Sequence, residues 1–300
     1  MASGGRGSGL LSTPILSGLF VFIWATGFIV AGIVATRAEP LTFLTARHAL
    51  SVVVFVVLSL AVRAAWPRNP RAWRDALIAG MLLHGLYIGG VFWAVSHGLP
   101  AGLTALVTGL HPLLTAVLAA PLLHERLVAR QWTGIAVGVV GVGLIVVPKL
   151  GTAEGVPLLA LFIALLATLS LTLGTIWQKR SKPQMDLRVN AAIQFLGALM
   201  LTAPVAAMTE AGRFDASPAL WGALAWAVLG LSVGGISILL VLLRRKAASK
   251  VAPLLYLSPA VAALIALMVF GEAIGGVQLV GMVLAVVGAF TAGSRSARLG

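Results

Sequence analysis

Residues 111–141 read HPLLTAVLAAPLLHERLVARQWTGIAVGVVG, and residues 258–288, 147 positions later, read SPAVAALIALMVFGEAIGGVQLVGMVLAVVG. Both stretches have a proline at the second position, a glutamate near the middle and glycines along the final part. The identical pairs of rarer residue types are Pro112 and Pro259, Glu125 and Glu272, Gln131 and Gln278, Gly134 and Gly281, and Gly141 and Gly288. Proline and glycine recur in any membrane protein, but this many ungapped identities at one spacing indicate an internal repeat.

The repeat extends towards the N-terminus. Gly27 pairs with Gly174 at the same spacing of 147, whereas GLYIGG at 85–90 corresponds to GLSVGG at 230–235 at a spacing of 145. A change of two residues in length therefore separates the two parts of each copy. We assign residues 14–148 to the first copy and 156–292 to the second. Residues 1–13 are rich in Gly and Ser and are expected to be disordered, and residues 293–300 form a short tail.

The composition is that of a membrane protein. Hydrophobic residues make up 60% of the 300 residues and charged residues only 10%, against about 45–50% and about 25% in soluble domains. The apolar residues form runs of roughly twenty, the length that a helix needs to cross a bilayer. We therefore predict an all-α integral membrane protein with ten transmembrane helices. The predicted spans are 14–35, 41–62, 75–96, 102–121, 131–148, 156–177, 188–208, 218–242, 251–270 and 275–292.

The distribution of basic residues predicts the orientation. With the N-terminus inside, 17 of the 21 Lys and Arg residues fall on the cytoplasmic side, and three (Arg37, Lys149 and Arg213) fall outside. This bias predicts that both termini lie in the cytoplasm of a bacterial inner membrane. Since each copy holds five spans, an odd number, the second copy must be inverted relative to the first.

Composition also excludes several classes of function. The net charge of +13 resides in short loops rather than on one face with interleaved aromatics, which argues against nucleic-acid binding. The chain has no cysteine, so disulfides, thiolate metal sites and cysteine nucleophiles are excluded. We expect no metal and no cofactor. A Gly-Lys-Ser/Thr phosphate loop is absent, so ATP is not expected to drive the protein directly.

Several features together resemble a known family. A proline within a helix is followed thirteen residues later by Glu125-Arg126, then by Gln131-Trp132-x-Gly134 and a glycine-rich last helix. This pattern resembles the EamA domain, two copies of which form the ten-helix members of the drug/metabolite transporter superfamily. The resemblance covers about 14–292 and departs from the pattern at Glu272-Ala273, where the second copy lacks the arginine. It implies a carrier of amino acids or related metabolites, often an exporter.

An inverted repeat suits a secondary transporter, because exchanging the shapes of the two halves opens the other side of the membrane. The alternatives are a channel or facilitator-type pore for small polar solutes, although no repeated polar rings are visible, and an intramembrane enzyme. Gly230-Leu-Ser232-Val-Gly234 fits the Gly-x-Ser-x-Gly motif of hydrolases, but that motif requires a strand–turn–helix context. The substrate, the direction of transport, the coupling ion and the oligomeric state are left open by the sequence.

Pro112 and Pro259 are predicted to lie within helices at equivalent positions. Each lacks an N–H donor, and each ring clashes with the carbonyl four residues earlier, at Thr108 and Leu255. They are either packing kinks or hinges whose freed carbonyls line a cavity.

Arg47 is the only Lys or Arg well inside a predicted span, where an unpaired charge costs about 2.5–3.5 kcal/mol at the helix centre. It either extends to the outer surface or faces a cavity and neutralises a substrate carboxylate. Its equivalent in the second copy is Gln194. No Asp or Glu lies well inside a span, so ion coupling would need another group.

His84 and Tyr87, one turn apart, and His111, before Pro112, are predicted to contact substrate in a cavity. The alternative for each is a hydrogen-bonded packing role. They offer aromatic faces and hydrogen bonds without negative charge, which suits a zwitterion. Weaker candidates for substrate binding are Trp24, Ser170, Ser232, Tyr256 and Ser258.

Overall fold

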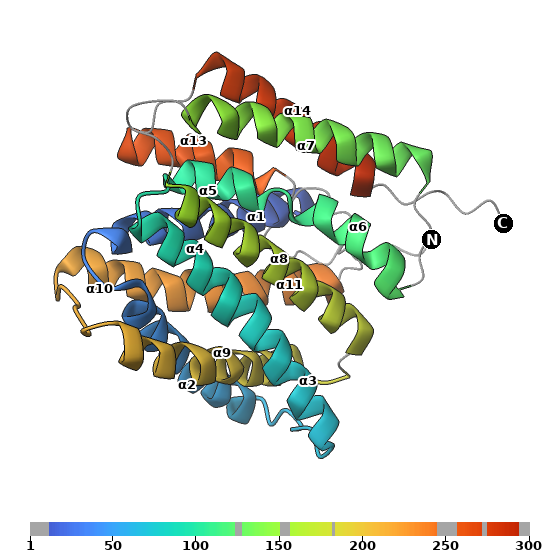
Figure 1. The fold of residues 1–300 in the computed structure, drawn as a ribbon. Coiled ribbons are helices and arrows are strands. Elements are labelled where there is room, and N and C mark those ends of the chain that lie inside the picture. The colour runs from blue at the N-terminus through green and yellow to red at the C-terminus, as the bar shows by residue number, and fades with distance from the viewer. Residues whose placement is uncertain are drawn as a thin grey trace, which may run out of the picture.

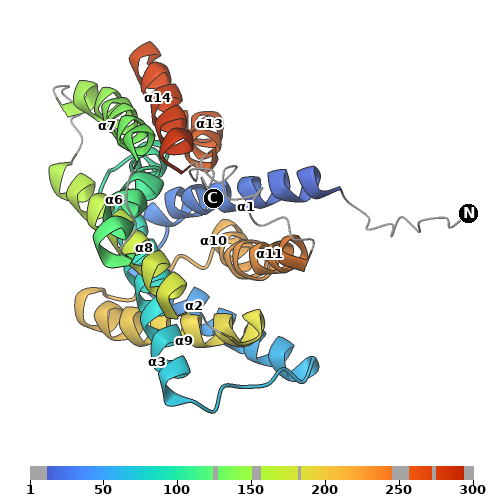
Figure 2. The same ribbon diagram turned by 90° about the vertical axis from the view of Figure 1, so that its right-hand side faces the viewer.

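The computed structural model describes residues 12–123, 128–150, 157–181, 184–244, 257–271 and 275–293, and these ranges are almost entirely helical (Figures 1 and 2). The elements of the first half are α1 (Thr13–Ala35), α2 (Pro40–Ala61), α3 (Pro70–Gly80), η1 (Met81–Leu86), α4 (Tyr87–Ser96), α5 (Ala101–Thr108), α6 (His111–Leu123) and α7 (Ala129–Leu150). Those of the second half are α8 (Leu158–Ser181), α9 (Leu187–Thr209), α10 (Pro218–Ala225), η2 (Trp226–Gly234), α11 (Gly235–Arg244), α13 (Ser258–Phe270) and α14 (Gly276–Gly293). The elements η1 and η2 are π-helical turns that continue the α-helices on either side of them.

Seven helical stretches among the described residues are long and apolar enough to cross a membrane. They are Thr13–Ala35, Pro40–Ala61, Pro70–Ser96, Ala101–Leu118, Leu158–Ser181, Leu187–Thr209 and Pro218–Leu239. Large apolar side chains such as Leu158 and Met208 are exposed on them, as expected of a surface that faces lipid. An all-helical membrane protein is thus confirmed. Helices α7, α13 and α14 lie in the other three predicted spans, and the count of ten crossings stays a prediction.

Helix starts follow the prolines. Pro14, Pro40, Pro70 and Pro218 each lie in the first turn of a helix, where the missing N–H has no partner to lose. At Pro70 the preceding Asn69 also caps the helix, because its side chain accepts a hydrogen bond from the Arg71 N–H. The third span therefore begins five residues before the predicted Asp75.

The spacing of the repeat recurs in the secondary structure. Helices α2 and α9 begin 147 residues apart, and so do α7 and α14. The π-helical turns η1 and η2 begin 145 residues apart, which is the spacing of the glycine motifs that overlap them. A π-helical turn is rare, so its recurrence at the equivalent place is a strong sign that the halves share one fold.

Helices α7 and α14 pack against each other along glycines (Figure 1). A Cβ atom at Gly134 would meet the backbone of Gly288, and one at Gly141 would meet the backbone of Gly281. The later residue of one helix thus contacts the earlier residue of the other, so the helices run antiparallel. Because Gly134 is equivalent to Gly281 and Gly141 to Gly288, the two contacts are copies of each other, as in an interface with two-fold symmetry.

Helices α2 and α9 show the same reciprocity. His48 Nδ1 lies 3.1 Å from Thr202 Oγ1, and the rings of Phe55 and Phe195 stack with centroids 5.7 Å apart. His48 is equivalent to Phe195, and Thr202 to Phe55. One antiparallel contact therefore appears twice with different chemistry, once as a polar pair and once as an aromatic pair.

The predicted kink at Pro112 is a complete break in the helix. Helix α5 ends at Thr108, and α6 begins at His111, so that Pro112 lies in the first turn of a new helix rather than within one. The reason is the clash with the Thr108 carbonyl, which the chain avoids by ending α5 there. Pro259 likewise lies in the first turn of α13, and the residues before Leu257 lie outside the described ranges. A Cβ at Gly109 would lie 3.0 Å from Pro259 Cγ, so the two proline regions meet.

Candidate functional site

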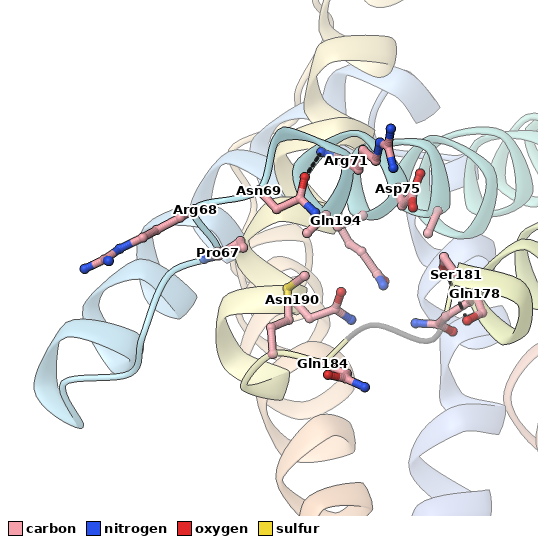
Figure 3. Close-up of a pocket in the computed structure, with 14 residues that line it drawn as sticks. Pro67, Arg68, Asn69, Arg71, Asp75, Gln178, Ser181, Gln184, Asn190 and Gln194 are labelled. Carbon is pink, nitrogen blue, oxygen red and sulfur yellow. Dashed lines mark hydrogen bonds between the residues drawn. The ribbon is translucent and has the colours of Figure 1, made fainter.

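A pocket of about 370 Å³ opens between α3, the end of α8 and the start of α9 (Figure 3). Nine of the fourteen residues that line it are polar or charged, in contrast to the apolar surface of the helices. Arg68 and Arg71 come from the start of α3 and the loop before it, whereas Asn190 and Gln194 come from α9. The pocket therefore extends from a loop region into the helical bundle.

Asn190 and Gln194 lie one turn apart on α9 and so share a face of that helix. Each is only 5% exposed, and within the described structure Asn190 Oδ1 and Gln194 Nε2 have no hydrogen-bond partner. The other amide atom, Gln194 Oε1, lies 3.3 Å from His84 Nε2 on η1. A buried acceptor and a buried donor thus remain available at the wall of the pocket.

His84 connects this wall to a second cluster. Its ring stacks on Phe195 at a centroid distance of 4.5 Å, and the His48 ring lies 6.0 Å from the same phenylalanine. Arg47 lies within electrostatic range of His48, His84 and Tyr87. The predicted residues Arg47, His84 and Tyr87 are therefore brought together, although Arg47 itself does not line the pocket.

Arg47 does not extend to the outer surface, which was one of the two positions that the sequence allowed. It is 5% exposed, and no hydrogen bond or ion pair joins it to any residue that the structure describes. The ion pairs found in the described ranges lie at helix ends: Arg74 with Asp75, Arg188 with Asp186, and Arg213 with Glu39. A guanidinium group that is enclosed without a counter-charge is unusual and costly.

His111 and Tyr87 have hydrogen-bond partners on neighbouring helices. His111 Nδ1 lies 3.1 Å from Thr172 Oγ1 on α8. The side chain of Tyr87 is hydrogen-bonded to Thr108, the last residue of α5. Both residues thus link the break between α5 and α6 to other helices, and substrate contact by either stays a prediction.

The weaker candidates divide into three kinds. Ser170 donates to the Leu82 carbonyl in η1 (2.9 Å), and Ser232 donates to the Ala227 carbonyl in η2 (3.1 Å). The two serines therefore satisfy carbonyls of the two π-helical turns. Trp24 lies on α1 and is 42% exposed, and Ser258 is buried at the start of α13. Tyr256 lies outside the described residues.

At the opposite end of the bundle, residues 36–39 and 210–215 are tied together, and we call this contact the clasp. The Glu210 carboxylate accepts hydrogen bonds from the N–H groups of Leu41 (2.9 Å) and Thr42 (2.6 Å), at the start of α2. The Arg213 N–H donates to Glu39 Oε2 (2.8 Å), and this bond lowers the pKa of the Glu39 carboxyl below its ordinary value. The clasp thus joins the first half to the second through carboxylates.

The clasp also contains one antiparallel β-bridge, between Ala38 and Phe214. The Glu39 N–H donates to the Arg213 carbonyl (3.0 Å), and the Asp215 N–H donates to the Arg37 carbonyl (2.8 Å). These bonds flank Ala38 and Phe214 without joining them, so the two residues form a non-hydrogen-bonded pair, in which the Cα atoms are closest.

The described part of the equivalent of the clasp, at a spacing of 147 residues, consists of residues 184–186 and 63–68. There Asp186, the equivalent of Glu39, accepts from the Arg188 N–H on its own helix (2.8 Å). In the described part of the chain no hydrogen bond crosses between these two segments, and Arg68 and Gln184 instead line the pocket. One of two equivalent ends is therefore tied, and the other is hollowed.

Sequence reasoning did not find the pocket, Asn190 or the clasp, and it noted Gln194 only as the equivalent of Arg47. The available signal was the pair of amide residues four apart within an otherwise apolar helix.

This arrangement, a bundle with an apolar exterior and a polar pocket that enters it from one end, is that of a multi-pass membrane protein. Comparison with known proteins identifies the family to which it belongs. The model of the EamA-like transporter family matches residues 12–147 and 158–293. The chain therefore belongs to this family of the drug/metabolite transporter superfamily, and the resemblance is confirmed.

Similar curated proteins are named as transporters. A "Probable amino-acid metabolite efflux pump" of Escherichia coli (strain K12) is 27% identical over 92% of this chain and 93% of its own length. The "Uncharacterized inner membrane transporter YedA" of the same organism is 26% identical over 83% of this chain and 80% of its own length. A solved crystal structure matches with a TM-score of 0.62 at 21% identity, over 93% of this chain and 96% of that one, which supports the fold alone. The chain is thus a membrane transporter.

Proposed function

We propose that the protein is a secondary transporter that moves amino acids or related small metabolites across the bacterial inner membrane, as an exporter, by alternating access. In this proposal ten transmembrane helices form two inverted repeats, residues 14–148 and 156–292. The observation that carries the proposal is the difference between equivalent ends: the clasp is tied, whereas its equivalent is open and lines the pocket. Two halves of one fold in different states are what alternating access requires.

The charge distribution assigns sides to this asymmetry. Segments 63–74 and 179–188, around the pocket, are rich in Lys and Arg and belong on the cytoplasmic side. The clasp then belongs on the outer side. The structure corresponds in this proposal to a state that is open to the cytoplasm, in which an exporter would collect its substrate.

The hinge role of Pro112 and Pro259 is part of the same proposal. Both prolines lie in the first turn of a helix, and Gly109 lies against Pro259, so the break between α5 and α6 meets the start of α13. A short segment between two rigid helices absorbs changes of backbone angle without disturbing the packing of either.

The substrate class rests on two supports. One similar protein of Escherichia coli is named "Probable amino-acid metabolite efflux pump". In addition, the wall of the pocket offers a hydrogen-bond donor and an acceptor that have no partner among the described residues. We assign substrate contact to the path from Asn190 and Gln194 to His84, Tyr87 and Arg47. Transport is expected without nucleotide.

The test is to lock the clasp with a disulfide in proteoliposomes. Ala38→Cys with Phe214→Cys places two thiols at the non-hydrogen-bonded bridge, where the distance suits a disulfide, and the chain has no other cysteine. Counterflow of radiolabelled amino acids should stop on oxidation and return on reduction. Each single cysteine variant, treated with the same oxidant, serves as the control and should keep its flux.

Full counterflow through the oxidised double variant would contradict alternating access. Flux that shows no counterflow and no saturation would support a channel instead. A strict requirement for ATP would contradict a secondary transporter.

A further inference from the structure

Arg47 is buried in the first half and has no counter-charge among the residues that the structure describes, so an anionic ligand would balance it. Resting on the proposed function, we infer that the substrate carries a free carboxylate and that Arg47 binds it. Asn190 and Gln194 line the route by which the substrate reaches Arg47.

No carboxylate among the described residues is paired with Arg47. The described carboxylates are those of Glu39, Asp75, Asp186, Glu210 and Asp215, and each lies in a connection, at a helix cap or in the first two turns of a helix. The carboxylates of Glu39 and Glu210, at the start of the same helix, are engaged in the clasp. None of these described carboxylates balances the charge of Arg47. Because an isolated buried cation is strongly disfavoured, the partner in this inference is an anionic ligand.

The chemistry of the group specifies the anion. A guanidinium is planar and presents five donors in a fork that matches the two oxygens of a carboxylate. Of these donors, the Nε–H group is buried and has no partner among the described residues. The neighbours His48, His84 and Tyr87 are aromatic and carry no negative charge that could replace the ligand.

The charges along the pocket favour the same ligand. Arg68 and Arg71 line it and form no ion pair in the described structure, whereas Asp75 is paired with Arg74 at 2.9 Å. The potential at the opening is therefore positive, and it attracts an anionic group. Further in, the free acceptor Asn190 Oδ1 suits an ammonium group. An α-amino acid meets both requirements, and a simple amine meets only one.

The first arm of the test measures thermal unfolding of the purified protein. Wild type is heated with each of the twenty L-amino acids, with their carboxamides, and with acetate and succinate. At least one carboxylate should raise the unfolding temperature, and its carboxamide should not, because only the bound form is stabilised. In Arg47→Gln this shift should disappear. The variant gives the first copy the residue type that the second copy has at the equivalent position, Gln194. Arg37→Gln, at an exposed arginine outside the site, should keep it.

The same arm distinguishes a binding role from a structural one. Without ligand, Arg47→Gln should unfold at the same temperature as wild type or a higher one, because an unbalanced charge is removed. A fall of several degrees would mean that Arg47 stabilises the fold through a protein partner and would overturn the inference. Arg47→Lys keeps the charge without the fork, and its shift should lie between those of wild type and Arg47→Gln.

The second arm measures competition in counterflow. The acid should compete about tenfold or more better than its carboxamide, as expected from a charge-assisted pair. Equal competition, or full competition in Arg47→Gln, would overturn the inference while leaving the transporter proposal intact. If no flux is seen at all, the transporter proposal fails, and the thermal shift alone decides whether Arg47 binds a carboxylate. If no carboxylate in the panel raises the unfolding temperature or competes in counterflow, the inference is wrong.

Discussion

At the residue scale, the polar side chains of the bundle differ in whether their hydrogen bonds are satisfied. Ser170 and Ser232 are fully used by the carbonyls of η1 and η2, whereas Arg47, Asn190 and Gln194 are buried with atoms left free among the described residues. Leaving a buried polar atom unpaired costs about 1–3 kcal/mol. A ligand could complete such atoms, and in our proposal Arg47, Asn190 and Gln194 therefore belong to the site, whereas the two serines do not.

His84→Ala tests the connection between the pocket and Arg47. The change removes the bond to Gln194 and the ring that stacks on Phe195. Counterflow should fall about tenfold or more, because one further buried amide atom is left unpaired, while the yield of folded protein is kept. His97→Ala is the matched control, since His97 is exposed and contacts Ser96 and Trp93 at the end of α4.

The sequence predicted part of this site for a clear reason. Arg47, His84 and Tyr87 are conspicuous in apolar helices, and the structure brings them together. His111 is equally conspicuous but is engaged with Thr172. If His84, Tyr87 and His111 can be replaced together with flux unchanged, the site lies elsewhere. Asn190 escaped prediction because an amide near the start of a helix also suits a helix end, and only tertiary packing shows it to be enclosed.

At the scale of elements, helix starts and the proline break follow from local chemistry, whereas the π-helical turns do not. Pro40, Pro70 and Pro218 mark where helices begin, and Pro112 marks where one must stop. Residues 81–86 and 226–234 carry no local signal for a π-helical turn beyond their recurrence. The carbonyl of Leu82 in η1 accepts from Ser170 on α8, a contact that local sequence does not show, whereas Ser232 lies within η2 itself.

Gly134→Leu tests the glycine contact between α7 and α14. A side chain at Gly134 would collide with the backbone of Gly288 and Ala292, which cannot move aside as a flexible side chain would. We expect a loss of stability of about 1–3 kcal/mol or more, measured as a lower unfolding temperature and less monodisperse protein. Gly143→Leu on the same helix is the control, because no atom lies within 4 Å of its Cβ position. Equal stability of the two variants would contradict the packing described.

Glu39→Gln tests the clasp through its pH dependence. Because the folded protein lowers the pKa of Glu39 below the ordinary 4.5, the carboxylate contributes stability above pH 4.5, and that contribution is lost as the pH falls through the lowered pKa. Wild type should therefore unfold at a higher temperature than Glu39→Gln near neutral pH, and the difference should vanish on acidification. Asp215→Asn, at an exposed residue of the same loop, should track wild type. A difference that grows on acidification would contradict the assignment.

At the scale of the whole molecule, the repeat and the charge bias together predict the topology. The chain has no native cysteine, so labelling of a single introduced cysteine can be detected without background. A cysteine at Ala216, beside the clasp, should react with an impermeant thiol reagent added outside intact cells. One at Ala248, which lies outside the described residues, should react only after the membrane is opened. External labelling at Ala248 would contradict the inverted arrangement of the two halves.

The global fold could be anticipated because the repeat is recorded in the sequence at two fixed spacings, and because span length is set by the bilayer. The state of the molecule could not. The segments of the clasp and their equivalents occupy matching positions, yet Glu39 bonds across to Arg213 whereas Asp186 bonds to Arg188 within its own helix. Which end is tied depends on a balance between two arrangements of one fold, and no local pattern encodes it.

The reciprocity of α2 and α9 has a consequence for the origin of the site. If the halves were separate, identical subunits, every residue facing the other half would be present twice, including an arginine at the position of Arg47. Gene duplication and fusion remove this constraint, because each copy then diverges independently. The fused chain keeps Arg in one copy and Gln194 in the other, and thus presents a lone cation to a ligand that carries a lone carboxylate.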